Sequence, residues 1–325
     1  MSGSATPFQH HQRLITDPDL FVDAVSGASL CVDLHKAMAG PARIEQFQSW
    51  DWAIDFSAVQ VDARVRGEAP HGWATMALIR SDAGSRWAGQ NVKPGTVLGN
   101  PPGVEIDGWV TPGFGWTSVS ASPALWAEGG RLAGIEHQNP RHLIIASIPP
   151  SLYSRLESRL HHVHRLLLAA IHHPSLAPGA NREARETALT LTSLVWELDA
   201  GSSRRNKPCS GRLHLARRAE EWMRHHLPEV VGIPDLCLAL NVSRRELEYA
   251  FRATFDVSPW DYFQKLRLNA IYRDLRCTPA NLPGYVTEIA LTHGITHLGR
   301  FSAQYRNLFG ERPSETLRRN HSRLK

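Results

Sequence analysis

Apolar and polar residues alternate along residues 50–66, WDWAIDFSAVQVDARVR, as they do in β-strands. The apolar side chains fall on even positions from Trp50 to Phe56 and on odd positions from Val59 onwards. A period of two predicts strands with one buried face, and the change of phase predicts a bulge or turn at Ser57-Ala58.

Clusters of Gly, Pro and Asn, such as GNPPG and TPGFG, divide the chain after this segment. Many short strands with frequent turns predict an all-β sandwich or barrel, here over about residues 45–150. The short apolar runs between these clusters lie at 73–79, 96–98, 104–110, 116–119 and 143–148.

The apolar period becomes helical after Pro149-Pro150. Leu156, Leu160, Val163 and Leu167 follow one another at spacings of three and four, and a similar run extends from Ala184 to Leu198. This pattern predicts a helical hairpin over residues 151–199, turned by HHPSLAPGAN. Its apolar stripe must be covered either by the strands of the same chain or by a second copy of the chain.

Residues 200–211, AGSSRRNKPCSG, are polar and rich in Gly and Ser, which is typical of a linker. They separate a domain at 1–200 from a domain at 212–325. Charge follows the same division: from Arg205 onwards there are 20 Lys and Arg against 12 Asp and Glu, whereas residues 1–204 have 16 against 19. The basic C-terminal domain is therefore expected to seek a polyanion such as DNA.

The C-terminal domain contains one small frame twice, FRATFDVSP at 251–259 and YRNLFGERP at 305–313. Before the first frame, Ser243 followed by Glu246 is the capping-box pattern that starts a helix. We predict a short helix, a turn and a second helix over about 233–255. The side chains expected to face inward from the second helix are Leu247, Ala250, Phe251 and Phe255.

The second copy, at about 286–309, repeats the plan. Ile289 and Ala290 belong to its short helix, Gly294 to its turn, and Thr296 or His297 to the cap of its second helix. Two helix-turn-helix motifs in one basic domain predict binding to the major groove of double-stranded DNA. The side chains expected to face inward from its second helix are Phe301, Tyr305, Leu308 and Phe309.

Residues 212–319 resemble the DNA-binding domain of the AraC/XylS family of bacterial transcription regulators. The most specific part is VTEIALTHGITHLGRFSAQYRNLFGERPSETLRR, with its turn Gly, its HLGRF run and its FGxxP ending, and RLNAIYRDLR resembles the helix that joins the two motifs. The resemblance implies an all-α domain of seven helices, whose two recognition helices enter adjacent major-groove segments about one helical turn (roughly 34 Å) apart.

The resemblance also implies roles for individual residues. Those expected to read bases are Arg245, Glu248 and Tyr249 in the first motif, and Leu298, Gly299, Ser302 and Ala303 in the second. Those expected to contact phosphates are Arg244, Arg252, Arg300 and Arg306. Gly299 and Ala303 leave the second helix few polar groups, so it is expected to rely on apolar contacts with thymine methyl groups, or to leave base reading to the first helix.

The layout of the N-terminal half is similar to the cupin-like effector and dimerisation domain of many such regulators. The expected fold class is therefore α+β with two domains, a β-rich cupin-like barrel with a helical hairpin and an all-α double helix-turn-helix domain. The expected protein is a homodimeric activator that contacts RNA polymerase and responds to a small-molecule effector. A repressor of the same family is the alternative, and the effector's binding residues are not predicted.

A metal-dependent cupin enzyme with an appended DNA-binding domain is the second alternative. Such a metal site needs an H-x-H-x₃₋₄-E cluster and a later His, and none of His71, His137 or His142 lies in such a frame. His161 and His164 are three residues apart, but no carboxylate partner is evident nearby, so a solvated helix face is expected. The sequence therefore predicts no catalytic residue, no metal and no cofactor.

The six tryptophans of the β-rich region are expected either to form an aromatic core or to line a ligand pocket. The six tryptophans are Trp50, Trp52, Trp73, Trp87, Trp109 and Trp116.

The four cysteines are at least 28 residues apart and form no C-x-x-C pair, which predicts reduced structural thiols. The N-terminus lacks a secretory pattern and no apolar run approaches 18 residues, so a cytoplasmic protein without a membrane span is expected.

Overall fold

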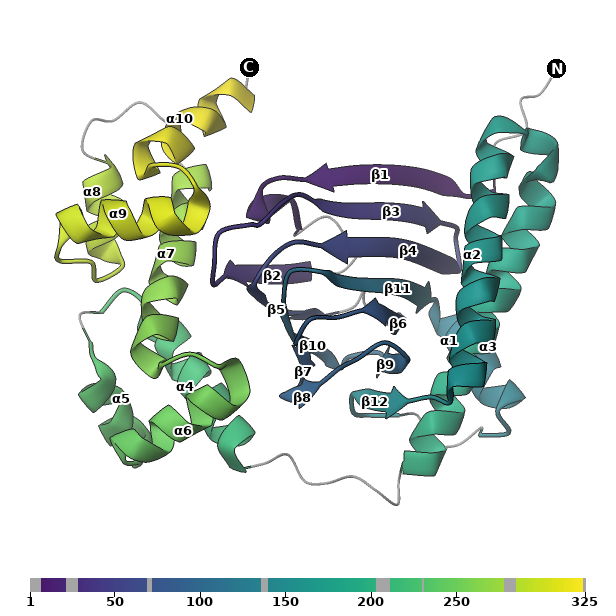
Figure 1. Cartoon of the computed structure of the whole chain (residues 1–325), viewed down its shortest axis with the longest axis horizontal. Coiled ribbons are helices and arrows are strands. Elements are labelled where there is room, and N and C mark those ends of the chain that lie inside the picture. Colours follow the sequence, from purple (N-terminus) through teal and green to yellow (C-terminus); the bar gives the residue numbers. More distant parts are fainter. Residues whose placement is uncertain are drawn as a thin grey trace. The chain divides into compact units, whose positions relative to one another are not determined.

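The chain divides into two compact units in the computed structural model (Figure 1). The first unit comprises Met1–Val32, Ala39–Val61 and Val65–Asn206, and the second comprises Asp33–Met38, Asp62–Arg64 and Lys207–Lys325. The structure describes residues 7–21, 29–68, 72–135, 140–202, 211–229, 231–277 and 285–323.

The first unit is built on two antiparallel sheets, in the part of the chain that the structure describes. The larger sheet has the strand order β1 (Gln9–Ile15), β3 (Ala42–Gln48), β4 (Trp52–Val59), β11 (Phe114–Ala121), β6 (Ala74–Ser81), β9 (Thr96–Asn100) and β12 (Ile144–Ser147). The smaller has the order β2 (Ser29–Leu34), β5 (Ala63–Glu68), β10 (Glu105–Val110), β7 (Arg86–Trp87) and β8 (Gln90–Asn91). A 3-10 turn, η1 (Pro18–Phe21), follows β1.

The predicted break at Ser57-Ala58 is wrong, because β4 runs unbroken from Trp52 to Val59. Its neighbours β3 and β11 pair with it in one continuous register across these residues. Within β4 the apolar side chains Trp52, Ile54 and Phe56 keep to even positions, and the odd positions Asp55 and Ser57 are buried polar residues. The change of phase belongs to the next segment, because the apolar odd positions from Val59 continue past the end of β4 into β5. Trp50 lies before the strand and is 76% exposed, which also contradicts its expected place on the buried face.

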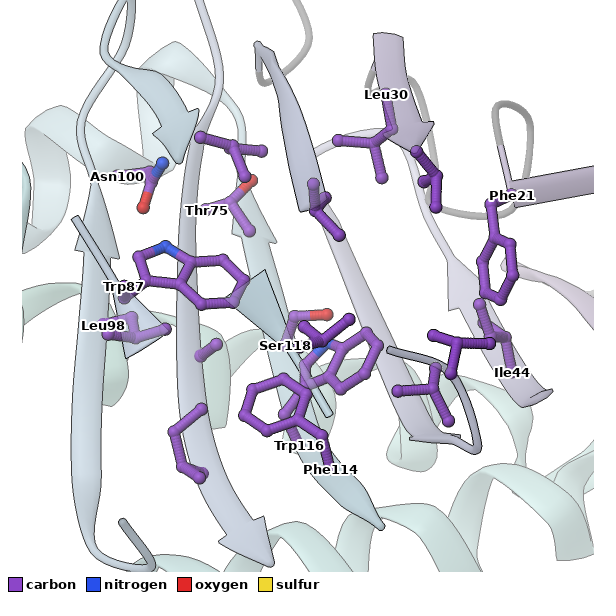
Figure 2. Close-up of a pocket in the computed structure, with 18 residues that line it drawn as sticks. Phe21, Leu30, Ile44, Thr75, Trp87, Leu98, Asn100, Phe114, Trp116 and Ser118 are labelled. Atoms are coloured by element: carbon purple, nitrogen blue, oxygen red, sulfur yellow. The ribbon is translucent and has the colours of Figure 1, made fainter. Parts of the chain in front are cut away.

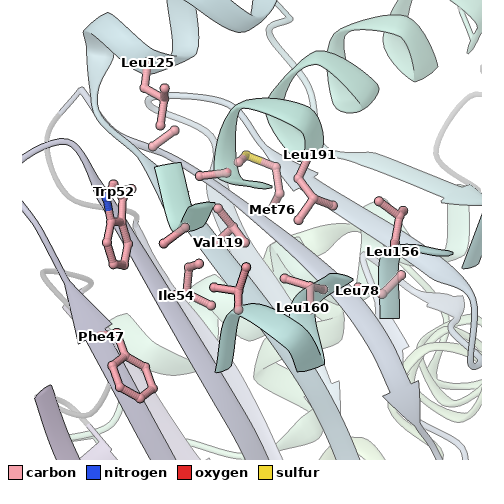
Figure 3. Close-up of a cluster of buried hydrophobic side chains, with 14 of the residues drawn as sticks. Phe47, Trp52, Ile54, Met76, Leu78, Val119, Leu125, Leu156, Leu160 and Leu191 are labelled. Carbon is pink, nitrogen blue, oxygen red and sulfur yellow. The ribbon is translucent and has the colours of Figure 1, made fainter. Parts of the chain in front are cut away.

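The predicted helical hairpin is confirmed as α2 (Pro150–His172) and α3 (Ala177–Ser202), joined by η2 (Pro174–Leu176). Together with α1 (Pro123–Leu132), these helices cover one face of the larger sheet (Figure 1). Their apolar stripe packs on the chain's own strands. Figure 3 shows Leu156, Leu160 and Leu191 of the hairpin facing Ile54 and Met76 of the sheet in one buried cluster.

His164 departs from the expected solvated helix face. Its Nε2 atom lies 2.6 Å from a Glu45 carboxylate oxygen of β3, and its side chain is only 23% exposed. The other oxygen of Glu45 lies 3.0 Å from Nε2 of His10 in β1. The carboxylate partner comes from a distant strand, which is why the helix sequence alone does not reveal it.

The opposite face of the larger sheet borders a cavity of about 100 Å³ (Figure 2). Strands of both sheets contribute to its wall, for example β11 with Ser118 from the larger sheet and β5 with Val65 from the smaller. The β-rich region therefore has an aliphatic core under the helices on one side of the larger sheet and a pocket on the other.

The second unit contains seven helices among its described residues. They are α4 (Gly211–His225), α5 (Ile233–Leu240), α6 (Arg244–Phe255), α7 (Pro259–Cys277), α8 (Tyr285–Thr292), α9 (Leu298–Phe309) and α10 (Pro313–Arg323). Most side chains of α7 are buried, since this helix joins the two motifs and packs against α6 and α8. Of the expected linker 200–211, residues 203–210 lie outside the described residues, and the remaining positions belong to α3 and α4.

Buried ion pairs stabilise this second unit. Arg64 donates to a Glu220 carboxylate oxygen at 3.0 Å, and the other oxygen of Glu220 accepts from the Tyr262 hydroxyl at 2.7 Å. Burial alone would raise the pKa of Asp33, but the guanidinium groups of Arg224 and Arg273 outweigh it and hold this pKa below its usual value. Removing one partner of such a pair leaves the other as an uncompensated buried charge.

No helix in the described ranges is both long and apolar enough to span a bilayer. Cys237 and Cys277 are free thiols, Cys31 is half-buried, and Cys209 lies outside the described residues.

Candidate nucleic-acid interface

The first helix-turn-helix motif is formed by α5 and α6. Helix α5 ends at Asn241, which adopts a left-handed conformation with φ of 53° and turns the chain. The predicted capping box is confirmed: the Ser243 hydroxyl accepts from the N–H of Glu246 at 3.2 Å, and the Glu246 carboxylate accepts from the N–H of Ser243 at 2.8 Å. These hydrogen bonds from Ser243 lower the pKa of Glu246.

The inner face of α6 is the one that the sequence predicts. Leu247, Ala250, Phe251 and Phe255 are all buried. The Phe255 ring stacks on Tyr262 of α7, with ring centres 4.8 Å apart and planes 24° apart. Aromatic packing of this kind fixes the helix from behind and leaves its opposite face available.

The outer face of α6 carries most of the predicted first-motif residues. Arg244, Arg245, Tyr249 and Arg252 are exposed, whereas Glu248 is only partly exposed and one of its carboxylate oxygens is buried. A short basic helix face of this width fits the major groove of DNA. Glu248 is therefore the least accessible of the three expected base readers on this helix.

The second motif is formed by α8 and α9, with a longer turn of five residues. Gly294 has φ of 68° in this turn, and a Cβ atom there would lie 2.7 Å from the carbonyl oxygen of Glu229. The left-handed backbone and the close contact both require glycine. His297 takes the cap position that the sequence assigns to Thr296 or His297, but its side chain makes no capping hydrogen bond.

Phe301, Tyr305 and Leu308 are buried behind α9 as predicted, and Phe309 is half-buried. The Phe309 ring stacks on Tyr272 of α7, with ring centres 4.4 Å apart. The Tyr305 hydroxyl donates to Thr316 of α10 at 2.9 Å. Both recognition helices thus rest on the aromatic side chains of the same joining helix.

The repeated frame explains how each recognition helix ends. Asp256 and Gly310 cap α6 and α9 in the left-handed conformation, with φ of 61° and 75°. Pro259 and Pro313 then start α7 and α10, as expected for proline in a first helical turn. The frame therefore supports the two helices, and Arg252 and Arg306 are its only members among the residues predicted to contact DNA.

The outer face of α9 differs chemically from that of α6. Leu298, which is 36% exposed, begins the helix, and all its predicted outer residues are exposed. Among the predicted outer residues of α9, only Arg300 and Arg306 are charged. The remaining outer residues, Gly299, Ser302 and Ala303, are small, so this helix can approach a groove closely but offers few hydrogen-bonding groups.

A family model described as a helix-turn-helix domain matches residues 236–319, which include most of both motifs. Over 101 residues the chain is 35% identical to the XylDLEGF operon transcriptional activator of Pseudomonas putida, a stretch that covers 31% of each protein. The chain belongs to the AraC/XylS family of transcriptional regulators.

Two further proteins of this family resemble the chain. The XylDLEGF operon transcriptional activator 3 of Pseudomonas putida is 34% identical over 133 residues, which cover 41% of this chain and 39% of that protein. A probable AraC family transcriptional regulator of known structure, from Rhodopseudomonas palustris, is 32% identical over 33% of this chain and 97% of its own, with a TM-score of 0.30. The chain thus spans about a third of the length of the first curated relatives that it matches.

The AraC/XylS chain has no cluster of three or more His, Cys, Asp or Glu that could hold a metal ion within the described ranges. Two of the histidines considered for a cupin metal site, His71 and His137, lie outside those ranges, and His142 pairs with Asp199 at 3.0 Å.

The sequence alone indicates no effector-binding residue in this chain. Of the six tryptophans, only Trp87 and Trp116 line the cavity in the described structure, while Trp52 packs in the core under the helices. Alternation along β4 and β6 marks one face of each strand as apolar. Which face borders a core and which borders a pocket depends on strand order and on helix placement.

Proposed function

We propose that this chain is a sequence-specific DNA-binding protein that regulates transcription. The supporting observation is a pair of equivalent helices, α6 and α9, each held from behind by aromatic residues and each exposing arginine on its outer face. The excess of Lys and Arg after Arg205 suits a polyanionic partner. Membership of the AraC/XylS family supports the same function.

In this proposal α6 and α9 contact DNA in different ways. Arg245 and Tyr249 read base edges from α6, with Glu248 beside them, since arginine can donate two hydrogen bonds to guanine. Leu298, Gly299, Ser302 and Ala303 lie against the groove at α9, where thymine methyl groups suit small and apolar side chains. The residues that hold phosphates and set the register are Arg244, Arg252, Arg300 and Arg306.

The first unit senses a small-molecule effector in this proposal, and the effector shifts the population of arrangements that engage DNA. The cavity between its sheets supports this role, since ligand sites are typically concave and mostly apolar. Activation through RNA polymerase is proposed rather than repression, because the first curated relatives are named as transcriptional activators. A reporter gene behind the bound operator decides this point: activation raises its expression with effector, and repression lowers it without effector.

We also propose that the protein acts as a homodimer in the cytoplasm. The hairpin buries its apolar stripe on its own sheet, so a dimer contact has to use other surfaces, such as that around Leu176, which is 45% exposed. Light scattering on the full chain tests this state: a mass that stays at 36.2 kDa up to high concentration contradicts a homodimer.

The test of DNA binding uses the full chain and a pool of random duplexes. Selection should enrich one sequence, and affinity for it should fall steeply as salt concentration rises, since counterions are released from phosphates. A full-length, folded chain that binds no duplex in a salt-dependent manner overturns the proposal. Binding that enriches no sequence leaves only a non-specific DNA-binding protein and overturns the regulator.

A further inference from the structure

The cavity of the first unit has one polar end and a long apolar body (Figure 2). Thr75, Trp87 and Asn100 lie close to one another in this view, whereas Phe21 and Ile44 lie at the opposite end. All five residues belong to the first unit, and side chains from both sheets line the space between them.

None of the described residues that line the cavity carries a charge. Two lining residues contact ionisable groups: the Ser118 hydroxyl donates to a carboxylate oxygen of Asp55 at 3.1 Å, and the backbone carbonyl of Trp116 accepts from the Arg80 guanidinium at 3.2 Å. Asp55 is buried, and burial raises its pKa to about 6, although the hydrogen bonds from Gln46 and Ser118 act in the opposite direction. An anionic ligand would thus lose its hydration without gaining a cationic partner among the lining residues.

Two buried hydrogen-bond donors at the polar end have no partner. The side-chain nitrogen of Asn100, a residue that is 5% exposed, donates to no acceptor in the described structure. The indole nitrogen of Trp87 is also buried without an acceptor. In Figure 2 this indole nitrogen is on the edge of the ring that faces Asn100. Buried polar groups are normally paired, and an unpaired donor lining a cavity calls for an acceptor on a ligand.

The position of Trp87 is fixed by its neighbours. Its ring stacks on Phe114, with planes 20° apart and ring centres 6.0 Å apart. On the paired strand β10, a Cβ atom at Gly108 would lie 2.6 Å from the Trp87 ring, so only glycine lets the ring lie flat there. The donor is therefore held in place before any ligand arrives.

We propose that this cavity binds an uncharged, mainly apolar molecule whose single acceptor oxygen takes hydrogen bonds from Asn100 and Trp87. A ketone, ester or amide carbonyl attached to a short chain is the expected class. This inference rests on the proposed function, because it names the effector of that regulator. The cavity of about 100 Å³ limits the ligand to fewer heavy atoms than a benzene ring, since an engineered apolar cavity of about 150 Å³ holds one benzene.

Three probes of nearly equal size separate the contribution of the acceptor oxygen to affinity from those of shape and of charge. Acetone has a neutral carbonyl, isobutene has the same shape without an acceptor oxygen, and acetate replaces the carbonyl by a carboxylate. Calorimetric titration of the full chain should give the highest affinity for acetone. We expect isobutene to bind roughly two- to hundredfold more weakly, as for the loss of one or two net hydrogen bonds, and acetate to bind more weakly than acetone.

Two variants connect this preference with the named donors. Asn100→Leu and Trp87→Phe should each reduce the preference for acetone over isobutene, while affinity for isobutene should stay within about twofold. Asn100→Leu also removes an unpaired buried amide, so the variant should fold. Leu166→Ala, in the hairpin and outside the cavity, is the matched control and should leave the preference unchanged.

Equal binding of acetone and isobutene overturns the inference, as does tighter binding of acetate or no binding of any probe. The same preparations are titrated with the selected duplex. If DNA binding is intact and the probe order is wrong, only the inference about the effector fails. If no duplex binds, the proposed regulator fails whatever the probes show.

Discussion

The guanidinium carbon of Arg245 lies 5.5 Å from the ring centre of Tyr249, on the exposed face of α6. One guanidinium nitrogen also donates to the Tyr249 hydroxyl, at 3.4 Å. The two residues are four apart in the helix and therefore share one face. A cation–π contact at an exposed site contributes about 0.5–1 kcal/mol, which orients the arginine but is weak enough to yield to a base.

Arg245→Ala should weaken binding to the selected duplex by about 1–3 kcal/mol, the usual value of a bidentate contact with a base. Affinity for unrelated duplexes should change little, because phosphate contacts supply it. The measurement is a pair of titrations, one with the selected duplex and one with a scrambled duplex. An equal loss for both would mean that Arg245 contacts phosphate instead.

Tyr249→Phe tests the hydroxyl separately. It keeps the ring beneath the guanidinium and removes the acceptor for Arg245, so the loss of affinity should be smaller than for Tyr249→Ala. If the two variants behave alike in the same titrations, the hydroxyl itself makes the contact with DNA.

Arg306→Ala should lower affinity for both duplexes, because Arg306 is proposed to hold a phosphate. The slope of the logarithm of affinity against the logarithm of salt concentration should become shallower by about 1. Titrations at four or more salt concentrations measure this slope. Arg86, a partly exposed arginine of the first unit, provides the control substitution Arg86→Ala, which should leave the slope unchanged. A loss of specificity with an unchanged slope would contradict the phosphate role.

Gly294→Ala should destabilise the second unit by about 1–3 kcal/mol, since alanine must adopt a left-handed backbone there. Its Cβ would also meet the Glu229 carbonyl oxygen at 2.7 Å. The matched control is Gly299→Ala in α9, where nothing lies within 4 Å of an added Cβ, and which should be neutral or stabilise by up to about 1 kcal/mol. Calorimetry of the full chain measures both. Equal stability of the two variants would show that the turn tolerates alanine.

Asp55 predicts a pH dependence for the first unit. Its pKa in the folded chain, about 6, lies above its ordinary value of 3.8 because the group is buried. The folded state therefore binds the proton more tightly than the unfolded state. The associated stability is fully present below pH 3.8, declines as pH rises to about 6, and amounts to about 3 kcal/mol.

Asp55→Asn should reduce this decline between pH 4 and pH 6.5. Eight of the ten tryptophans lie in the first unit, so denaturation followed by tryptophan fluorescence reports mainly on it. Glu186→Gln, at a side chain that is 55% exposed, is the control and should keep the original decline. An unchanged decline in Asp55→Asn would place the responsible group elsewhere.

The sequence revealed the helix-turn-helix motifs at the level of single residues. Ser243 and Glu246 cap a helix through contacts three residues apart, and Phe251 and Phe255 lie one turn apart on one face. Such signals are local, so they can be read without knowing the rest of the fold. The 54-residue repeat adds a second copy of the aromatic spacing, at Tyr305 and Phe309, but not of the capping box.

The wrong predictions concern features that depend on contacts between distant parts of the chain. The phase change at Ser57-Ala58 indicated a break, but pairing with β3 and β11 keeps β4 continuous, and the apolar odd positions after Val59 lie beyond the end of this strand. Glu45 reaches His164 across 119 residues of sequence. No pattern within either segment carries that information.

The sequence by itself thus determined the two motifs, their caps and their outward residues, because helices are stabilised by neighbours within one or two turns. Only the tertiary structure decided that Asn100 and Trp87 are unpaired donors at the end of an apolar cavity. The order β4, β11, β6, β9 and the facing smaller sheet bring these strands together. Sheet pairing joins residues that are far apart in the chain, so strand order and enclosed space arise only when the whole unit folds.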